Sequence, residues 1–307
     1  MDITFSVVIP LYNKGREIAR TLGGVAAQTY TPLEVIVVDD GSTDDSARVV
    51  EGLDLPGVRL IRQPNGGVSA ARGIAEAKGD YIALLDADDY WKPEYLERVA
   101  ALIGRYPGCG LYSMGFEVHR PEGVFPNETV MQEGIVGNYF RTAMRVNLTQ
   151  TSSVTIPRAV FERLGGFPEG MKLGEDQYVW TKIARTYPVC YSPQRFSEFN
   201  LMAQNRSAQN YKMERTPYSF WEFYDPGTPD CNEYVARCEI GKALVHSVYG
   251  YTDAALEVER RYSYNRHYRL GWWKLRILNR LPVMWRRPLL DSYKRVTWLV
   301  SKKGLLG

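Results

Sequence analysis

Residues 33–44 read Leu33-Glu-Val-Ile-Val-Val-Asp-Asp-Gly-Ser-Thr-Asp44. A run of β-branched residues of this length is typical of a strand buried on both faces, as in a parallel sheet. The two acids and Gly-Ser-Thr that follow are residue types that form turns and cap helices. The stretch therefore predicts a buried strand, a tight turn and the start of a helix, which is part of a βαβ unit.

The same pattern repeats on both sides of this stretch. Stretches of strand type cover 6–10, 58–62 and 81–85, and helical spacing follows over 16–28, 68–78 and 93–105. Strands and helices that alternate at these lengths predict right-handed crossovers and a mainly parallel sheet flanked by helices. After residue 105 the pattern is less regular. It indicates strands at 111–118, 152–156 and 189–191, helices at 158–164 and 175–185, and a loop-rich segment at 197–232.

Composition limits the class of protein. The chain has 307 residues, of which 45% are hydrophobic and 24% charged, so disordered and collagen-like chains are excluded. No apolar run approaches the roughly 20 residues that a membrane-spanning helix needs. Residues 1–10 hold no basic cluster before their apolar run, so we expect no secretory signal and a cytoplasmic location.

Polar residues follow each of the first four predicted strands: Tyr12-Asn13-Lys14, Asp39-Asp40-Gly41-Ser42, Asn65-Gly66-Gly67 with Arg72 beyond it, and Asp86-Ala87-Asp88-Asp89. In an open parallel sheet, ligands bind outside the carboxyl ends of the strands. Neighbouring carboxylates repel one another, and a divalent cation with oxygen ligands would relieve that repulsion. Such a cation beside a diphosphate would also offset the charge of a leaving group.

Plainer explanations stay open for each of these residues. An Asp-x-Asp motif is expected about once by chance in a chain of this composition, so the motif alone does not indicate a site. Its position directly after a predicted strand is what favours a functional role. Asp88 or Asp89 could cap the helix near Pro93, and Asp39 and Asp40 could be turn acids. Arg72 could be an ordinary arginine on a helix surface.

Four ordered motifs resemble those of family 2 glycosyltransferases: Val7-Val-Ile-Pro-Leu-Tyr-Asn13, Val37-Val-Asp-Asp-Gly-Ser-Thr-Asp44, Asn65-Gly-Gly-Val-Ser-Ala-Ala-Arg72 and Leu84-Leu-Asp-Ala-Asp-Asp89. The resemblance extends more loosely through Gly165-Gly-Phe167 and Gly174-Glu-Asp176. It implies an inverting enzyme that uses a nucleotide sugar, with a GT-A, Rossmann-like α/β fold. The implied transferase domain covers 1–210, with a nucleotide-binding half at 1–105 and an acceptor half at 106–210.

The resemblance also implies a role for each residue. In the donor site, Pro10 and Tyr12 would flank the nucleobase, and Asp40 would accept the N3–H of a uracil while Asp39 orients the loop. Asp86 would hold the ribose or a neighbouring basic group, and Ala87 would belong to the nucleotide site. Arg72 would meet the nucleotide or diphosphate, and Asp88 would bind Mn²⁺ or Mg²⁺.

The acidic pair at 175–176 matches the family's catalytic position. Asp176 would be the base that takes the acceptor's proton, and Glu175 would position the acceptor. Two acids at a helix N-terminus have a purely structural explanation too, and we expect that helix end to lower the pKa of Asp176 until an acceptor binds. The stretch Phe199–Ser207 lacks the histidine that many relatives carry, which leaves Arg206 as a candidate for the phosphates. The three histidines, His119, His246 and His267, are expected to be structural.

The last 48 residues, 260–307, differ from the rest of the chain. They carry 13 Lys and Arg against the single acid Asp291, whereas 1–110 has a net charge of −5 and 111–259 of −4. Apolar residues at helical spacing, Leu270-Trp273-Ile277-Leu281 and Leu289-Tyr293-Val296-Val300, form two stripes that Pro282 and Pro288 separate. Such a basic, aromatic helical extension predicts peripheral binding to an anionic membrane at its inner face. The alternative is that the two stripes pack on the transferase domain. Residues 211–259 would connect that domain to the extension. Binding of nucleic acid by the extension is disfavoured, because the rest of the chain is acidic.

The sequence thus predicts a metal-dependent hexosyltransferase-type enzyme. It would move a sugar from a nucleoside diphosphate, with uridine favoured, to a hydroxyl of a saccharide or lipid-linked acceptor in cell-surface polysaccharide or glycolipid synthesis. The alternative is a catalytically inactive nucleotide-binding or scaffold protein of the same fold. An oxidoreductase is disfavoured because residues 10–15 lack the Gly-x-Gly-x-x-Gly turn.

Overall fold

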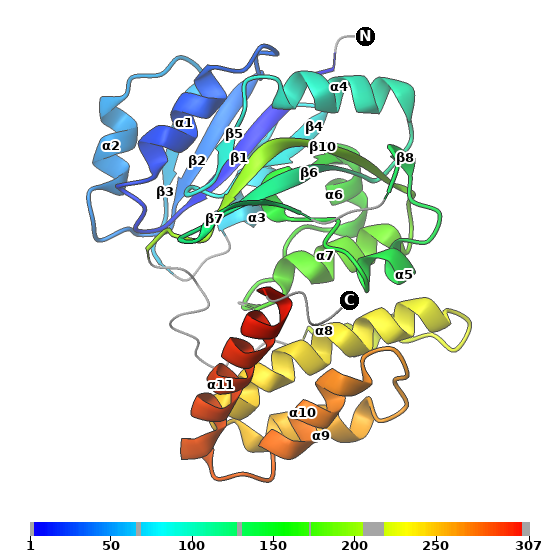
Figure 1. The fold of residues 1–307 in the computed structure, drawn as a ribbon. Helices are drawn as coiled ribbons and strands as arrows, with labels where there is room; N and C mark the ends of the chain where they lie inside the picture. Colours follow the sequence, from blue (N-terminus) through cyan, green and yellow to red (C-terminus); the bar gives the residue numbers. More distant parts are fainter. Residues whose placement is uncertain (1–2, 66–68, 128–130, 172, 205–217, 303–307) are drawn as a thin grey trace. The chain divides into compact units, whose positions relative to one another are not determined.

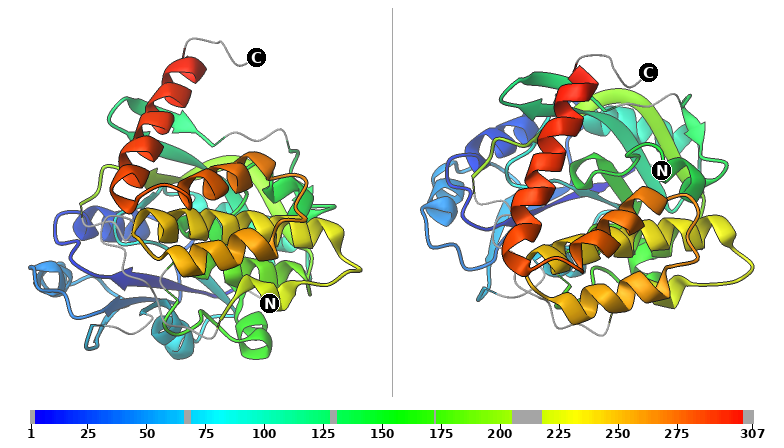
Figure 2. Two further views of the ribbon diagram at one scale, coloured as in Figure 1. Left: turned by 90° about the horizontal axis from the view of Figure 1, so that it is seen from below. Right: turned by 60° about the horizontal axis from the view of Figure 1, so that its bottom comes forward.

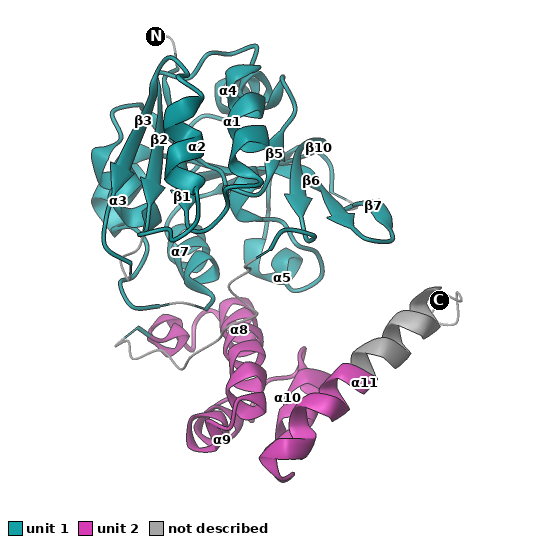
Figure 3. Cartoon of the chain, turned by 90° about the vertical axis from the view of Figure 1, so that its left-hand side faces the viewer, with its two compact units in different colours: residues 1–210, 214–218 teal, residues 211–213, 219–307 magenta. Residues whose placement is uncertain are grey.

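The computed structural model describes residues 3–65, 69–127, 131–171, 173–204 and 218–302, and only the backbone of 293–302. The chain divides into two compact units (Figure 3). Unit 1 comprises residues 1–210 and 214–218, and unit 2 comprises residues 211–213 and 219–307.

The first four strands of unit 1 are parallel, as predicted. They are β1 (Phe5–Leu11), β2 (Glu34–Asp39), β3 (Val58–Arg62) and β4 (Tyr81–Leu84), in the spatial order β3-β2-β1-β4. The connecting helices α1 (Ile18–Ala26) and α2 (Ser46–Gly52) lie on one face of the sheet, and α3 (Ser69–Glu76) lies on the other (Figures 1 and 3). Right-handed crossovers require this change of face, because the chain reverses direction across the sheet after β3. The strand order therefore switches between β1 and β4.

Close packing at α3 fixes this region. Gly73 faces β1 so closely that a Cβ atom there would lie 2.4 Å from Cγ1 of Val8. The buried runs of β1 and β2 pack with α1 into a core that includes Val7, Val37 and Leu22. The elements that carry the strand ends are thus held in a rigid frame.

Beyond β4 the sheet is mixed rather than parallel. The order continues with β9 (Val154–Pro157), β6 (Leu111–Arg120), β10 (Val189–Asn200) and β5 (Tyr90–Trp91). β9 is antiparallel to β4 and β6, β10 is parallel to β6, and β5 is antiparallel to β10. The short strands β7 (Gly123–Pro126) and β8 (Gly134–Ile135) pair antiparallel with β6 and β10. The strand predicted at 189–191 is the start of the 12-residue β10.

Helices complete unit 1. They are α4 (Tyr95–Arg105), α5 (Tyr139–Ala143), α6 (Arg158–Leu164) and α7 (Glu175–Ala184), with a 3₁₀ turn at Thr151–Ser153. The positions of α4, α6 and α7 agree with the sequence to within a few residues. The α/β prediction is confirmed.

Unit 2 is helical. A 3₁₀ turn at Phe220–Phe223 precedes α8 (Pro229–Val248), α9 (Thr252–Arg261), α10 (Arg269–Leu278) and α11 (Val283–Lys302), coloured yellow to red in Figure 2. The side chain of Arg286 is buried and donates hydrogen bonds to the carbonyls of Ser247 and Leu281 at 2.9 and 3.0 Å, which fixes the start of α11.

Pro288 does not separate two helices, contrary to the sequence prediction. It lies inside α11, while Pro282 precedes that helix. A proline near the start of a helix removes one backbone hydrogen bond but can be accommodated by a kink. Within the described residues, no helix is both long and apolar enough to cross a membrane.

Candidate active site

The loop after β1 is fastened to the loop after β2. Asn13 adopts a left-handed conformation with φ of 51°, and its Oδ1 accepts the N–H of Thr43 at 2.7 Å. Its own N–H donates to Oγ of Ser42 at 2.9 Å, and the N–H of Lys14 donates to Oγ of Ser46 at 2.8 Å. These bonds place the predicted nucleobase residues beside the end of β2, where the Tyr12 ring is 40% exposed.

The two acids at the end of β2 lie in different environments. Asp39 is buried, and its Oδ1 accepts the N–H of Ser42 at 3.0 Å, so this carboxylate orients its own loop. The N–H of Asp40 donates to the carbonyl of Leu11 at 2.9 Å, and Oδ1 accepts from Nε2 of Gln63 at 2.8 Å. Asp40 is thus held at the carboxyl ends of β1 and β2.

Arg72 lies on the surface of α3. Its guanidinium pairs with the carboxylate of Glu76, one turn further along, at 2.8 Å, and its side chain is 54% exposed. This geometry matches the alternative that the sequence left open for Arg72. Glu76 in turn also pairs with Arg59 at 3.1 Å.

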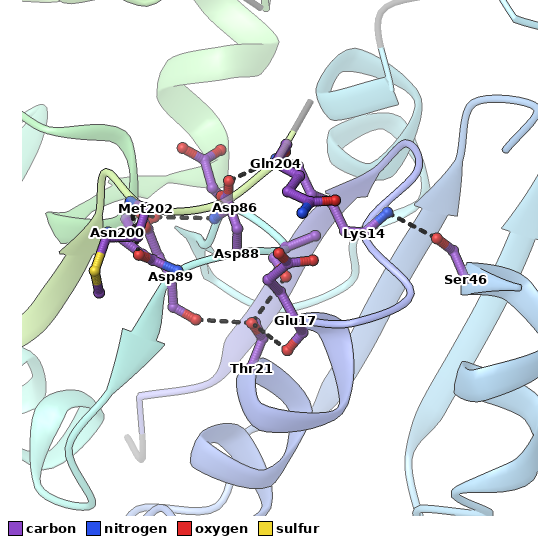
Figure 4. Close-up of polar contacts among 12 residues, drawn as sticks. Lys14, Glu17, Thr21, Ser46, Asp86, Asp88, Asp89, Asn200, Met202 and Gln204 are labelled. Carbon is purple, nitrogen blue, oxygen red and sulfur yellow. Dashed lines mark hydrogen bonds and ion pairs between the residues drawn. The ribbon is translucent and has the colours of Figure 1, made fainter. Parts of the chain in front are cut away.

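The acidic motif after β4 is held from two sides (Figure 4). Oγ1 of Thr21 in α1 donates to the carbonyls of Ala87 and Asp89 at 2.9 and 2.7 Å. On the other side, Oγ of Ser152 in the 3₁₀ turn accepts the N–H of Asp86 at 2.9 Å and donates to Oδ2 of Asp89 at 2.6 Å. The peptide that carries the acids is therefore rigid, and Ala87 is buried within it.

Asp89 is a buried network residue and does not cap a helix. Its carboxylate also accepts from Nε2 of Gln150 at 3.0 Å and from the N–H of Asn200 at 2.8 Å. Burial is the largest cause that raises its pKa, to about 7, and the charge of Asp88 adds to it. The helix-cap explanation for Asp89 is wrong, because the N-cap residue of α4 is Glu94, and no side chain makes a capping hydrogen bond there.

Asp88 points toward a lysine. The Lys14 ammonium lies 2.7 Å from Oδ2 of Asp88 and 2.6 Å from the carbonyl oxygen of Gln204, and both side chains are largely buried (Figure 4). The first strand-end loop, the acidic motif and the segment after β10 thus meet at one point. Sequence spacing gave no signal for this contact, because its partners lie 74 and 190 residues apart.

Asp86 shows that acids from distant parts of the chain converge. Burial raises its pKa well above the ordinary value, and the charges of Asp89, Asp88, Asp176 and Glu175 raise it further. The first turn of α7 therefore lies close enough to the end of β4 for its two acids to act on Asp86.

Asp176 corrects one expectation. It occupies the first turn of α7 behind Gly174, which has φ of 78°, and its Oδ1 accepts the N–H of Gln177 at 2.6 Å. Burial nevertheless raises the pKa of Asp176 above its ordinary value, although the backbone N–H groups of Gln177 and Asp176 oppose that rise. The expected lowering by the helix end is thus outweighed by desolvation before any acceptor is present.

The donor set suits a hard divalent cation. Carboxylate oxygens of Asp86 and Asp88 lie among further acids, which is the ligand chemistry of Mn²⁺ and Mg²⁺. Burial and, after it, repulsion by the neighbouring acids raise the pKa of Asp86, and a bound cation would offset that repulsion. Asp89 is committed to its hydrogen bonds, so Asp86 and Asp88 remain the better candidates.

A second group of possible ligands lies in the same unit. Ligand atoms of Glu117, His119 and Glu198 are within 4.8 Å of one another. Lys92 pairs with Glu117 at 3.0 Å, and Arg20 pairs with Glu198, so cations already neutralise both carboxylates. His119 thus has charged neighbours that its sequence context did not reveal. Arg206 lies outside the described residues.

Comparison with known proteins decides the family. Residues 6–143 match the model of glycosyl transferase family 2. The chain carries a family 2 glycosyltransferase domain. It is 42% identical to the amylovoran biosynthesis glycosyltransferase AmsB of Erwinia amylovora over 36% of this chain and 38% of AmsB. It is also 42% identical to the uncharacterized glycosyltransferase YibD of Escherichia coli, over 32% of this chain and 29% of YibD.

The glycosyltransferase match is partial in length. The chain spans about a third of the length of these curated relatives. A crystal structure of S. aureus TarS in complex with UDP-GlcNAc superposes on 95% of this chain and 92% of that chain, with a TM-score of 0.65 and 18% identity. The likeness confirms the GT-A fold expected for a family 2 glycosyltransferase.

Proposed function

We propose that this glycosyltransferase moves a sugar from uridine diphosphate to a hydroxyl group of a saccharide or lipid-linked acceptor, with inversion at the anomeric carbon. The observation that carries the proposal is that the charges of Asp88, Asp176 and Glu175 all act on the buried Asp86, which follows β4 beside the switch point of the sheet. The UDP and UDP-GlcNAc complexes of the fold relative TarS support a uridine donor. The similarity to AmsB supports a role in polysaccharide synthesis at the cell surface.

The donor would bind across the ends of β1, β2 and β4. Tyr12 offers an exposed ring face to the uracil beside Pro10, and Asp40 accepts its N3–H. Asp39 holds the loop on which Asp40 stands. Asp86 and Ala87 would contact the ribose.

The diphosphate needs positive charge. Arg72 would supply part of this positive charge by breaking its ion pair with Glu76. That pair is exposed and so contributes little to stability. Asp88, with Asp86 beside it, would hold Mn²⁺ or Mg²⁺. A bound divalent cation offsets the negative charge that builds on the leaving diphosphate.

The transfer step uses the acids of α7. As the acceptor oxygen forms its bond to the anomeric carbon, the bond from that carbon to the diphosphate oxygen breaks, and the acceptor's hydroxyl proton passes to Asp176. The raised pKa of Asp176 makes this carboxylate a stronger proton acceptor than an exposed aspartate. Glu175 would orient the acceptor hydroxyl.

A thermal-shift screen of nucleoside diphosphates and their sugars, with and without Mn²⁺, tests the proposal. We expect UDP and UDP-sugars at saturating concentration to raise the melting temperature by about 5 °C with Mn²⁺, and much less without it. Absence of any uridine-dependent shift would contradict the donor assignment. A shift without turnover of any UDP-sugar would favour the inactive nucleotide-binding alternative.

We further propose a division of labour along the chain. Residues 1–210 form the transferase domain, with donor half 1–105 and acceptor half 106–210, and 211–259 connects it to a membrane-docking segment at 260–307. The protein would act at the cytoplasmic face of the membrane, where a lipid-linked acceptor is accessible.

Exposed apolar side chains in unit 2 support membrane docking. Leu270, Trp273 and Ile277 are 76%, 47% and 53% exposed on one face of α10. Met284 and Trp285 at the start of α11 are 76% and 59% exposed. Basic side chains border these residues: Arg269, Lys274, Arg276, Arg280 and Arg287. The side chains of the second predicted stripe, apart from Leu289, lie outside the described part of the chain.

A further inference from the structure

Lys14 is built into the site by its backbone. Its N–H donates to Oγ of Ser46, and its carbonyl accepts the N–H groups of Glu17 and Ile18 at 3.0 and 2.9 Å where α1 begins. The residue is 9% exposed. Because the backbone is fixed on both sides, the direction in which its side chain leaves the loop is also fixed.

The ammonium group is the notable feature. Among the residues that the structure describes, the ammonium donates to Oδ2 of Asp88 and to the carbonyl oxygen of Gln204. A buried lysine is costly unless it is paired and hydrogen-bonded, and here the partners come from two other segments (Figure 4). The contact therefore joins the β1 loop, the acidic motif and the chain beyond β10.

This position conflicts with a divalent cation. An ammonium nitrogen 2.7 Å from Oδ2 of Asp88 occupies the space in which a metal ion would meet that oxygen, and two positive charges so close repel each other. We infer that Lys14 is the internal counter-ion of the donor-free site: it competes with the divalent cation for Asp88 and releases Gln204 when it is displaced. The inference rests on the proposed function in one respect, the binding of a cation by Asp88.

Binding of Mn²⁺ alone to the full chain, without nucleotide, tests the competition. Lys14→Met removes the charge and keeps the aliphatic stem, so this variant should bind Mn²⁺ at least tenfold more tightly than the wild type by electron paramagnetic resonance of free Mn²⁺. Lys78→Met is the matched control, because Lys78 is exposed and precedes β4, at the opposite end of that strand from the acidic motif, and it should leave the affinity unchanged. Equal or weaker binding by Lys14→Met, or no Mn²⁺ binding by either protein, overturns the inference.

A measurement on the wild type avoids any folding defect of the variant. Acetylation of amines, followed by mass spectrometry, should modify Lys14 slowly in the metal-free protein and at least threefold faster with saturating Mn²⁺. Lys78, exposed at the opposite end of β4, serves as the internal reference and should react at one rate in both conditions. A Lys14 rate that Mn²⁺ leaves unchanged or lowers overturns the inference.

The two proposals fail separately. If Mn²⁺ displaces Lys14 but no nucleotide sugar reacts, the transferase proposal fails and the role of Lys14 stands. If a UDP-sugar is turned over while Lys14→Met and the wild type bind Mn²⁺ equally, the role of Lys14 fails and the transferase proposal stands.

Discussion

Asp176 stands where the first turn of α7 meets the acids after β4, and its role can be separated from donor binding. Asp176→Asn keeps the size of the side chain but removes the proton acceptor. We expect UDP affinity within about twofold of the wild type, because the donor residues are untouched, and a loss of turnover of about 10²–10⁴-fold. Calorimetry and a product assay measure the two quantities. Near-wild-type turnover would assign the base to another residue.

Asp89 should make stability depend on pH. Its pKa is about 7 in the folded protein against 3.8 ordinarily, so between these values the folded chain binds a proton that the unfolded chain has lost. The free energy of unfolding should therefore fall as the pH rises from about 4 to about 7. At 1.36 kcal/mol per pKa unit, the fall is at most about 4 kcal/mol.

Asp89→Asn should remove the part of the pH dependence of the free energy of unfolding that corresponds to about one proton. Urea unfolding of the metal-free protein at several pH values measures it. Asp54→Asn is the control, because Asp54 is exposed and asparagine tolerates its φ of 43°. A slope unchanged by Asp89→Asn would show that Asp89 is ionised at low pH in the folded state.

Single residues also show where sequence reasoning ends. The acids at 86, 88 and 176 could be chosen as candidates from the sequence because each follows a recognisable strand or opens a helix. Ser152 and Gln150 carry no such mark, yet they fix Asp89 through contacts across 63 and 61 positions. Lys14 stands among the strand-end residues of the sequence, but its contact with Asp88 was not predictable, since only the folded chain brings the two side chains together.

At the level of elements, α10 has two apolar faces. Trp272, Leu275 and Leu278 are buried in unit 2, and Nε1 of Trp272 donates to the carbonyl of Glu259 at 2.8 Å. The opposite face presents Leu270, Trp273 and Ile277, which is the arrangement of an interfacial helix.

The double change Leu270→Glu with Trp273→Glu should weaken binding to vesicles containing phosphatidylserine more than tenfold, because it removes apolar contact and adds repulsion. The melting temperature should not change, since both side chains are exposed. Val124→Glu with Ile135→Glu, at sites 55% and 54% exposed in unit 1, is the control in cosedimentation. Unchanged vesicle binding, or a lower melting temperature, would favour packing on the chain.

Elements differ in how far their sequences define them. The long β-branched runs of β1 and β2 need only local pattern, so their positions were predictable. β5 and β8 have two residues each and exist through pairing with β10, which no local pattern encodes. The continuation of α11 through Pro288 likewise depends on the packing of Arg286, which anchors the helix just before the proline.

For the whole molecule, topology explains the site. The order β3-β2-β1-β4 puts the ends of β1 and β4 side by side, and the antiparallel β9 carries the chain onward to α7. The charges of Glu175 and Asp176 thereby act on Asp86 at the end of β4, where burial and these charges raise its pKa. The central claim is that the edge of the sheet where β1 and β4 end binds a uridine nucleotide together with a cation held by Asp88.

Calorimetric titration of UDP, with and without Mn²⁺, into the wild type and into Asp88→Asn tests that claim most directly. The account predicts that Mn²⁺ tightens UDP binding at least tenfold in the wild type and leaves Asp88→Asn unaffected, with Asp54→Asn behaving as wild type. Equal Mn²⁺-dependent affinity in the wild type and Asp88→Asn would contradict it.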